Sequence, residues 1–246
     1  MNRSFMEKRV LLDFHSHILP GMDDGAQYPQ ESLAMLIEEA KADITDVCLS
    51  PHFYADENSI TSFLKRRQHS YSLLCAEKKN RKERLPNLYL SAEVHYFAGM
   101  AEEPLLDLLC CGASNLILIE PPMRKWDKSF YSELNRIRDK RKLQPVIAHL
   151  DRYLSILDDF SLVTKIRNNG YWIQCNAEFF LSREYRSVAC DLLHGGEIAF
   201  LGSDAHNMSS RPVEMKSLLK LLKKERLAER FFALSSKGLD HIIGHS

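Results

Sequence analysis

Two histidines and two aspartates early in the sequence have the types and spacing of half a metal site. His15 and His17 close a short apolar run, and Asp23 and Asp24 lie in the loop that follows. Side chains on a strand alternate between its faces, so the two imidazoles are expected to point to the same side. A single buried histidine is usually an ordinary core residue. The pair beside an Asp-Asp-Gly turn instead favours ligands of a hard metal ion.

Ligand-type residues also follow most of the other strand-like runs. Six of the seven runs end in His, Asp or Glu, where packing alone would place apolar residues. Parallel βα folds build their active sites at the carboxyl ends of strands, so these side chains are expected to meet. Beyond the first loop, the candidates are His52, Glu93, Glu120, His149, Asp204 and His206.

The types of these candidates indicate a particular chemistry. They mix imidazoles with carboxylates and include no cysteine, which suits Mn²⁺, Fe, Zn²⁺ or Mg²⁺ rather than a thiolate structural site. About nine candidates exceed what one ion needs, so two or three ions are expected. Such clusters polarise phosphoryl oxygens and generate hydroxide near neutral pH. The pattern therefore predicts hydrolysis, and phosphoester hydrolysis first.

Two arginines follow ligand candidates closely in sequence. Arg152 comes three residues after His149, and Arg211 comes five residues after His206. A guanidinium group binds non-bridging phosphate oxygens through charge-assisted, often bidentate hydrogen bonds. A lone arginine is more often a partner in a surface ion pair. Their positions just after ligand-bearing strands make both of them candidates for binding a phosphate.

A second phosphatase pattern is also present. Cys75 and Arg81 have the Cys-x5-Arg spacing of thiolate phosphatases. A thiolate loop surrounds phosphate with backbone N–H groups, so it favours glycine and small residues at a strand-to-helix turn. Residues 75–81 are largely charged, lack glycine and continue a helical pattern. The match is therefore interpreted as a coincidence.

Short apolar runs alternate with longer helical stretches along the chain, without a repeat or a Gly/Ser linker between them. Helical periodicity begins near Tyr28 and recurs after Ile60, and residues 213–232 also have an amphipathic helical pattern. This alternation predicts an α/β barrel of parallel βα units in a single domain, residues 1–246, with an open doubly wound sheet as the alternative. The expected strands are residues 10–14, 46–50, 88–92, 115–120, 145–148, 171–176 and 197–202.

The composition favours a globular, cytoplasmic protein. The 246 residues are 45% hydrophobic, and 33 basic residues balance 33 acidic ones, which predicts no general attraction to nucleic acid or membrane. Six cysteines without a Cys-x-x-Cys pair suggest a reduced compartment. The sequence shows no signal peptide and no apolar run long enough for a membrane span.

Together these motifs resemble the PHP (polymerase and histidinol phosphatase) superfamily of metal-dependent phosphoesterases. Within it, the chain is most similar to the CpsB-type tyrosine phosphatases of bacterial capsule and exopolysaccharide synthesis. The similarity extends from DFHSHILPGMDDG at 13–25 through SDAHN at 203–207 to SRP at 210–212. The Asp-Asp-Gly turn distinguishes these enzymes from the histidinol phosphatases. The resemblance implies a distorted (β/α)7 TIM-like barrel, the PHP fold, with three metal ions that are commonly manganese.

The resemblance also assigns the candidate ligands to the three ions, with Glu93 bridging the first ion to the second. Each position has the residue type that the family pattern requires. Arg152 and Arg211 match the positions that bind phosphate. The first ion would take His15, His17 and Asp204, the second Glu120 and His149, and the third Asp24, His52 and His206.

The implied activity is hydrolysis of phosphotyrosine on a bacterial tyrosine autokinase that regulates polysaccharide synthesis and export. A metal-bound hydroxide would attack phosphorus in line, and the tyrosine phenolate would leave. Phenol has a pKa of about 10, so its departure needs less help from an acid than that of an alkoxide. Where an acid is needed, the candidates are a metal-bound water and Asp23. The sequence leaves the oligomeric state open.

A few positions depart from the family pattern or remain unassigned. Phe53 follows His52 where relatives often have a polar or basic residue, and Asp43 replaces a usual glycine in a turn. His95 lies two residues after Glu93 and is expected to line the pocket, with contact to the metals or the substrate as the alternative.

Two other functions are consistent with the same residues. The metal core also suits a PHP phosphoesterase that acts on a small molecule such as histidinol phosphate or a nucleotide, because the core does not fix the substrate. A metal-binding regulatory or scaffolding module without turnover is the third hypothesis. The complete ligand set argues against it.

Overall fold

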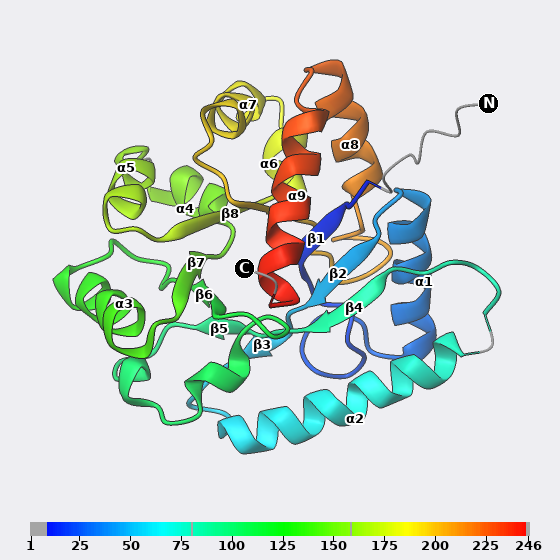
Figure 1. Ribbon diagram of the computed structural model, residues 1–246, viewed down its shortest axis with the longest axis horizontal. Helices are drawn as coiled ribbons and strands as arrows, with labels where there is room; N and C mark the ends of the chain where they lie inside the picture. Colours follow the sequence, from blue (N-terminus) through cyan, green and yellow to red (C-terminus); the bar gives the residue numbers. More distant parts are fainter. Residues whose placement is uncertain (1–8, 80, 158, 245–246) are drawn as a thin grey trace.

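Nine short strands form the centre of the computed structural model, which describes residues 9–79, 81–157 and 159–244 (Figure 1). Every pairing between neighbouring strands is parallel. The strands are β1 Leu12–Ser16, β2 Asp46–Leu49, β3 His52–Phe53, β4 Asn87–Leu90, β5 Glu93–His95, β6 Leu116–Glu120, β7 Gln144–Ile147, β8 Trp172–Asn176 and β9 Phe200–Gly202.

The strands form one curled parallel arrangement. The order is β1-β2-β4 in one sheet and β3-β5-β6-β7-β8-β9 in the other. Two residues separate β2 from β3 and β4 from β5, so these pairs continue one sheet into the other. At the far edge, the N–H of His17 donates to the carbonyl of Ala205 (2.9 Å), and the N–H of Asp204 donates to the carbonyl of His15 (2.8 Å). The last strand therefore lies beside the first.

Helices surround the strands, and α9 lies across β1 (Figure 1). Gly238 of α9 allows this close approach, because a Cβ there would lie 2.7 Å from the Phe200 ring and 3.1 Å from the Leu12 side chain. None of the described helices is long and apolar enough to cross a membrane. The helices are α1 Pro29–Lys41, α2 Ile60–Lys78, α3 Lys128–Arg141, α4 Leu150–Leu157, α5 Ser161–Asn168, α6 Ala177–Leu181, α7 Arg186–Gly195, α8 Met215–Lys224 and α9 Ala228–Ile242, with 3-10 turns at Met100–Glu102 and Leu106–Leu109.

Alternate residues of the strands pack in two separate apolar clusters. On β6, Ile117 and Ile119 belong to a large cluster that includes apolar side chains from the helices. Leu116 and Leu118 belong to a smaller cluster with Phe14. This alternation is the period of two expected of a strand. Burial on both faces explains why the strands are short, continuous apolar runs in the sequence.

The strand positions expected from the sequence are those observed, with two differences in detail. The second and third expected strands end at Leu49 and Leu90, and after two further residues each is followed by a short strand, β3 or β5, that lies beyond the expected range. The expectation of one helix over residues 213–232 was wrong. The chain forms α8 and α9 there, separated by a turn in which Arg226 has a φ of 61°. The buried leucines of α8 have helical spacing and are followed closely by the apolar residues of α9, so the sequence pattern does not show where one helix ends and the next begins.

Candidate metal centre

The end of β1 brings its two histidines together. The register with β2 shifts between Asp13 and Ser16, an irregularity of the kind that redirects side chains at the end of a strand. His15 and His17 are fully buried, and their Nε2 atoms lie 3.1 Å apart. The two imidazoles therefore lie on the same side, as their spacing indicates.

A carboxylate from β5 and one from the loop after β9 meet these imidazoles. Glu93 Oε2 lies 3.1 Å from His15 Nε2 and 3.2 Å from His17 Nε2. Asp204 Oδ1 lies 3.6 Å from His15 Nε2 and 3.3 Å from His17 Nε2. The four buried side chains thus offer one ligand atom each to a common point, and together they could hold a metal ion.

A second group lies beside the first and includes the more exposed Asp24. Asp24 Oδ1 is 3.3 Å from His206 Nε2 and 3.7 Å from His52 Nε2. The His17 ring stacks on that of His206 with a centroid distance of 3.9 Å, which joins this group to the first. His17, Asp24, His52 and His206 form a second set of atoms close enough to share an ion.

The third group is centred on Glu93 and Glu120. His52 Nδ1 lies 3.1 Å from Glu93 Oε2 and 4.0 Å from Glu120 Oε2, and these three residues could share an ion. His149 Nε2 lies 2.7 Å from Glu93 Oε1 and 3.6 Å from Glu120 Oε1. The structure therefore brings together all nine of the ligand candidates, which we call the ligand cluster: His15, His17, Asp24, His52, Glu93, Glu120, His149, Asp204 and His206.

Opposite charges are strongly balanced within the ligand cluster. Burial alone would raise the pKa of Glu93, but the surrounding imidazoles, His15 foremost, hold that pKa well below its usual range. The pKa of Asp204 is lowered in the same way. Burial would lower the pKa of His17, but Asp23 and the carboxylates of the cluster raise it well above its usual value. Ionised carboxylates therefore face the imidazoles.

Unpaired buried atoms show that the ligand cluster fits a bound cation. Glu93 Oε2, His52 Nδ1 and His206 Nε2 are buried and form no hydrogen bond with the described part of the chain. Leaving such atoms without a partner is costly, and most buried polar atoms have one. A divalent ion satisfies converging imidazole and carboxylate lone pairs. The donor set includes no thiolate, so it suits manganese, iron, zinc or magnesium.

Two members of the ligand cluster have a left-handed backbone. The φ angle is 29° at His149 and 51° at Asp204. Non-glycine residues adopt this conformation uncommonly, although Asn, Asp and His do so more often than others. Such conformations concentrate at functional sites, where the surrounding structure holds them in place. In both cases the turn comes two residues after the last residue of a strand, β7 or β9.

Both candidate arginines contact the far side of Asp204. Arg152 Nη2 and Arg211 Nη2 each lie 2.8 Å from Asp204 Oδ2. The amide of Asn176 donates to the same oxygen over 2.9 Å. Each guanidinium has five N–H groups, so both arginines keep donors for a ligand. Asp204 thus links the ligand cluster to two partly exposed cations.

Sequence reasoning missed two supporting residues on β8. Gln174 Oε1 accepts a hydrogen bond from the N–H of His149 (2.6 Å) and lies 3.2 Å from His15 Nδ1. Its amide donates to Asn176, which in turn donates to Asp204. These contacts fix the orientation of ligand candidates, as partners behind a metal ligand commonly do. Two polar residues spaced by two in an otherwise apolar run were the available signal.

Asp23 is fully engaged inside the loop after β1. Its Oδ2 lies 2.8 Å from His17 Nδ1 and accepts the N–H of His52 over 2.8 Å, while Oδ1 accepts the N–H of Gly25 over 2.9 Å. Burial would raise the pKa of Asp23, but His17 and these hydrogen bonds outweigh it and lower the pKa to about 2. The geometry therefore favours an ionised carboxylate that orients His17 over a proton donor.

His95 lies at the border of the ligand cluster. Its Nδ1 is 3.0 Å from Glu120 Oε2, and its side chain is 39% exposed. The Tyr54 ring packs against two imidazoles, with centroid distances of 5.3 Å to His52 and 5.4 Å to His95. Burial, together with Glu120 and Glu93, raises the pKa of Tyr54, so its phenol is neutral.

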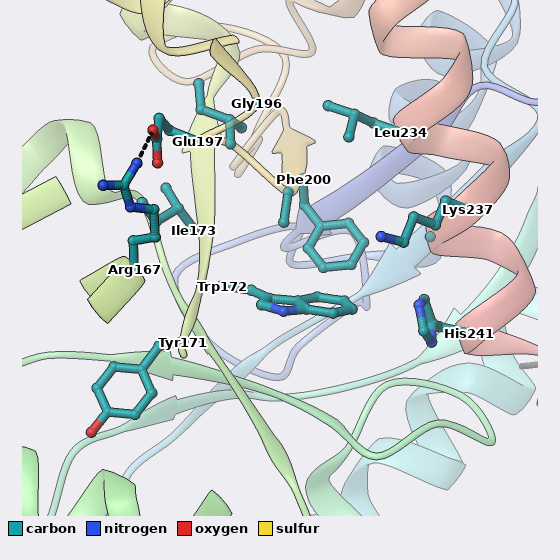
Figure 2. A pocket seen from close by; sticks show the side chains of 13 residues that line it. Arg167, Tyr171, Trp172, Ile173, Gly196, Glu197, Phe200, Leu234, Lys237 and His241 are labelled. Atoms are coloured by element: carbon teal, nitrogen blue, oxygen red, sulfur yellow. Dashed lines mark hydrogen bonds and ion pairs between the residues drawn. The ribbon is translucent and has the colours of Figure 1, made fainter. Parts of the chain in front are cut away.

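Neither the Cys-x5-Arg pattern nor a separate cavity provides comparable chemistry. Cys75 lies within α2, which extends to Lys78, so no strand-to-helix loop surrounds the thiol. A cavity of about 240 Å³ lies between α9 and the starts of β8 and β9, with Trp172, Phe200 and His241 in its walls (Figure 2). It contains none of the nine ligand candidates. The ligand cluster lies instead at the carboxyl ends of the strands.

The fold and the site define a class of α/β proteins that gather imidazoles and carboxylates where parallel strands end. The chain belongs to the CpsB/CapC family of capsular polysaccharide synthesis, whose family model matches residues 11–241. This membership agrees with the resemblance seen in the sequence motifs.

Named relatives cover most of the chain. The tyrosine-protein phosphatase CpsB of Streptococcus agalactiae serotype III (strain NEM316) is 26% identical over 234 residues, covering 89% of this chain and 93% of the relative. The tyrosine-protein phosphatase YwqE of Bacillus subtilis (strain 168) is 27% identical over 228 residues, covering 87% and 85%.

A solved structure has the same fold. Crystal structures of YwqE from Bacillus subtilis and CpsB from Streptococcus pneumoniae, described as unique metal-dependent tyrosine phosphatases, include a chain that superposes with a TM-score of 0.77. The identity is 22%, and the match covers 94% of both chains. The mixed α/β fold with a curled parallel sheet is thus shared with this structure.

Proposed function

We propose that this protein is a metal-dependent protein-tyrosine phosphatase of capsular or exopolysaccharide synthesis. The observation that carries the proposal is the pair of contacts made by Asp204. One oxygen faces His15 and His17 in the ligand cluster, and the other binds Arg152 and Arg211. The candidate metal ligands and the candidate phosphate-binding groups therefore lie next to each other, as phosphoester hydrolysis requires. The names of the relatives CpsB and YwqE support phosphotyrosine as the substrate.

The roles of the side chains follow from their positions. The nine residues of the ligand cluster would hold the metal ions, with Glu93 shared between two groups. Bound metal ions would supply an activated water as nucleophile and neutralise charge on the phosphoryl oxygens. Arg152 and Arg211 bind the non-bridging oxygens through their free N–H groups. Asp23 holds His17 in one tautomer, with Nε2 directed to the cluster.

Finer features of the proposal come from the family resemblance. They are a distorted (β/α)7 TIM-like barrel of the PHP type, a single domain over residues 1–246, three Mn²⁺ ions and a cytoplasmic location. The partner is a phosphotyrosine segment of a bacterial tyrosine autokinase. The order of the strands supports the barrel, because the seven expected strand positions follow one another around the curl and β9 returns beside β1.

A comparison of substrates tests the proposal. With Mn²⁺ present, kcat/KM for a phosphotyrosine peptide is expected to exceed that for histidinol phosphate and for a nucleoside monophosphate by at least about tenfold. Preference for either metabolite would contradict the tyrosine assignment and favour the small-molecule phosphoesterase. Failure to hydrolyse any of the three would favour a module without turnover.

The orienting role of Asp23 predicts a loss of metal affinity. Asp23→Asn should weaken Mn²⁺ binding by about 10- to 100-fold, because partners that orient a metal-bound histidine typically contribute that much. Asp191→Asn, on the exposed surface of α7, is the matched control. Isothermal titration calorimetry with Mn²⁺ measures the change in Kd. Unaltered Mn²⁺ affinity with lost turnover would instead assign Asp23 to proton donation.

A further inference from the structure

An aromatic side chain borders the ligand cluster at residues that the two arginines do not contact. Tyr54 follows β3 and lies over two imidazoles, with interplanar angles of 30° to His52 and 45° to His95. We call Tyr54 and His95 the aromatic shelf. Arg152 and Arg211 instead contact Asp204, and Arg211 Nη1 also lies 3.7 Å from Asp24 Oδ2. The shelf and the arginines therefore reach the ligand cluster through different members.

The position of Tyr54 is fixed by the turn that follows it. Its carbonyl accepts the N–H of Glu57 (3.2 Å) and the N–H of Asn58 (3.1 Å). His95 is fixed from the other side through its contact with Glu120 (3.0 Å). Tyr54 itself is half-buried, so part of its ring remains accessible. Because its backbone is held by this turn and its ring by two imidazoles, Tyr54 loses less side-chain entropy on binding than a free side chain would.

The two edges of the ligand cluster suit the two ends of an aryl phosphate. Arginines hold non-bridging oxygens, so the phosphoryl group occupies the cluster beside Arg152 and Arg211. The bridging oxygen and its substituent would then extend toward the exposed residues at the border of the cluster. These include Asp24 and His95, whose side chains are 66% and 39% exposed. Tyr54 packs against His95 and is itself half-buried.

We propose that the aromatic shelf selects aryl over alkyl phosphates by stacking with the aromatic ring of the substrate, Tyr54 being the specificity-determining residue. Aromatic pairs prefer offset or tilted stacking and gain affinity beyond the area that they bury. The phosphotyrosine ring therefore binds over Tyr54, whereas an alkyl chain makes no equivalent contact. This inference rests on the proposed function, since it deepens the choice of phosphotyrosine as substrate.

Binding of phosphonates to the metal-loaded protein tests the shelf without requiring turnover. Benzylphosphonate and ethylphosphonate share the phosphonate group and differ in the ring. Tyr54→Ala is expected to raise the calorimetric Kd of benzylphosphonate by about five- to tenfold and to leave that of ethylphosphonate within about twofold. Tyr54→Phe, which keeps the ring, should bind both like the original protein.

A matched control and three outcomes make the test decisive. Phe232→Ala removes a half-buried ring of α9 against which Arg9 packs and which contacts no member of the ligand cluster in the described structure, so it should change neither Kd. An equal loss of both phosphonates, or no loss of either, would overturn the shelf. Loss of metal from Tyr54→Ala, measured by mass spectrometry, would assign Tyr54 to holding His52 and would also overturn it. Failure to hydrolyse phosphotyrosine would refute the proposed function separately, because these binding constants need no hydrolysis.

Discussion

Replacing Asp204 with asparagine is expected to lower kcat/KM for a phosphotyrosine peptide by about 10³-fold or more. The substitution removes a charge shared by two parts of the site. Oδ1 lies within 3.6 Å of ring nitrogens of His15 and His17, and Oδ2 lies 2.8 Å from both Arg152 and Arg211. Metal-ion catalysis provides several kcal/mol, and about 4 kcal/mol corresponds to this factor.

The matched control for this change is Asp240→Asn on the exposed surface of α9, which should keep full activity. Circular dichroism and metal analysis accompany the kinetics, to separate lost metal from lost folding. Cys75→Ser completes the comparison and should leave activity nearly unchanged, because Cys75 lies within α2. If Cys75→Ser were inactive and Asp204→Asn active, the Cys-x5-Arg pattern would be the reaction centre after all.

The location of the site was predictable because one physical rule governs it. Parallel strands present their carboxyl ends at one edge, and a buried strand is visible in sequence as a short apolar run. A polar residue that ends such a run, like Glu120 after Leu116–Ile119, is therefore a candidate for the site. The His15–His17 spacing needed only the alternation of a strand. Both features depend only on residues that are neighbours in sequence, so they can be recognised without knowing which strands lie side by side.

The contacts among site residues were not predictable, because they depend on how distant strands meet. Gln174 receives a hydrogen bond from His149 and reaches His15, residues that lie 25 and 159 positions away. Nothing in a polar pair on an apolar strand specifies these partners. The role of Tyr54 likewise depends on His95, which β5 brings beside β3.

Errors in the helices have a different cause. The helical pattern of apolar residues does not mark the end of α8, because α8 buries leucines and a methionine and α9 again buries apolar residues such as Phe231 and Ile242. The break between α8 and α9 depends on the left-handed conformation of Arg226, which the presence of an arginine does not predict. Asp43, by contrast, occupies a position where glycine was expected, and its φ of 63° explains why. Aspartate tolerates this conformation better than most residues do.

Removing metal is expected to abolish turnover and to lower the thermal stability of the protein in a pH-dependent way. The ligand cluster buries Glu93, Asp204 and several imidazoles together, so a bound divalent ion stabilises only the folded state. At a metal concentration about 100 times its Kd, metal binding raises the free energy of unfolding by about 2.7 kcal/mol. For a chain of this size, that corresponds to a fall in Tm of about 5–10 °C on chelation.

The sign of the pH dependence above about pH 7 follows from His15 and His17. Burial lowers the pKa values of His52 and His206, so both are neutral in this range and add no change. In metal-free protein the pKa of His17 is raised well above its usual value of 6.5, and that of His15 is also raised. Their contribution to stability is complete below the unfolded pKa and is lost as pH rises through the folded pKa. Metal binds the deprotonated imidazoles, so its stabilising effect grows over the same range. The low pKa values of Glu93 and Asp204 add no change there, because both stay ionised.

Thermal unfolding with and without Mn²⁺, measured from about pH 7 to about pH 9, is therefore expected to give two diverging curves. Metal-free protein should lose stability toward high pH, and the metal-loaded protein should not. His69→Ala, on the exposed part of α2, is the control that should leave both curves unchanged. Parallel curves would mean that the imidazoles of the cluster do not bind the ion. Turnover should stop on thorough chelation, because the arginines alone provide no nucleophile. Turnover that survived chelation would exclude metal from the reaction itself, whatever the effect on stability.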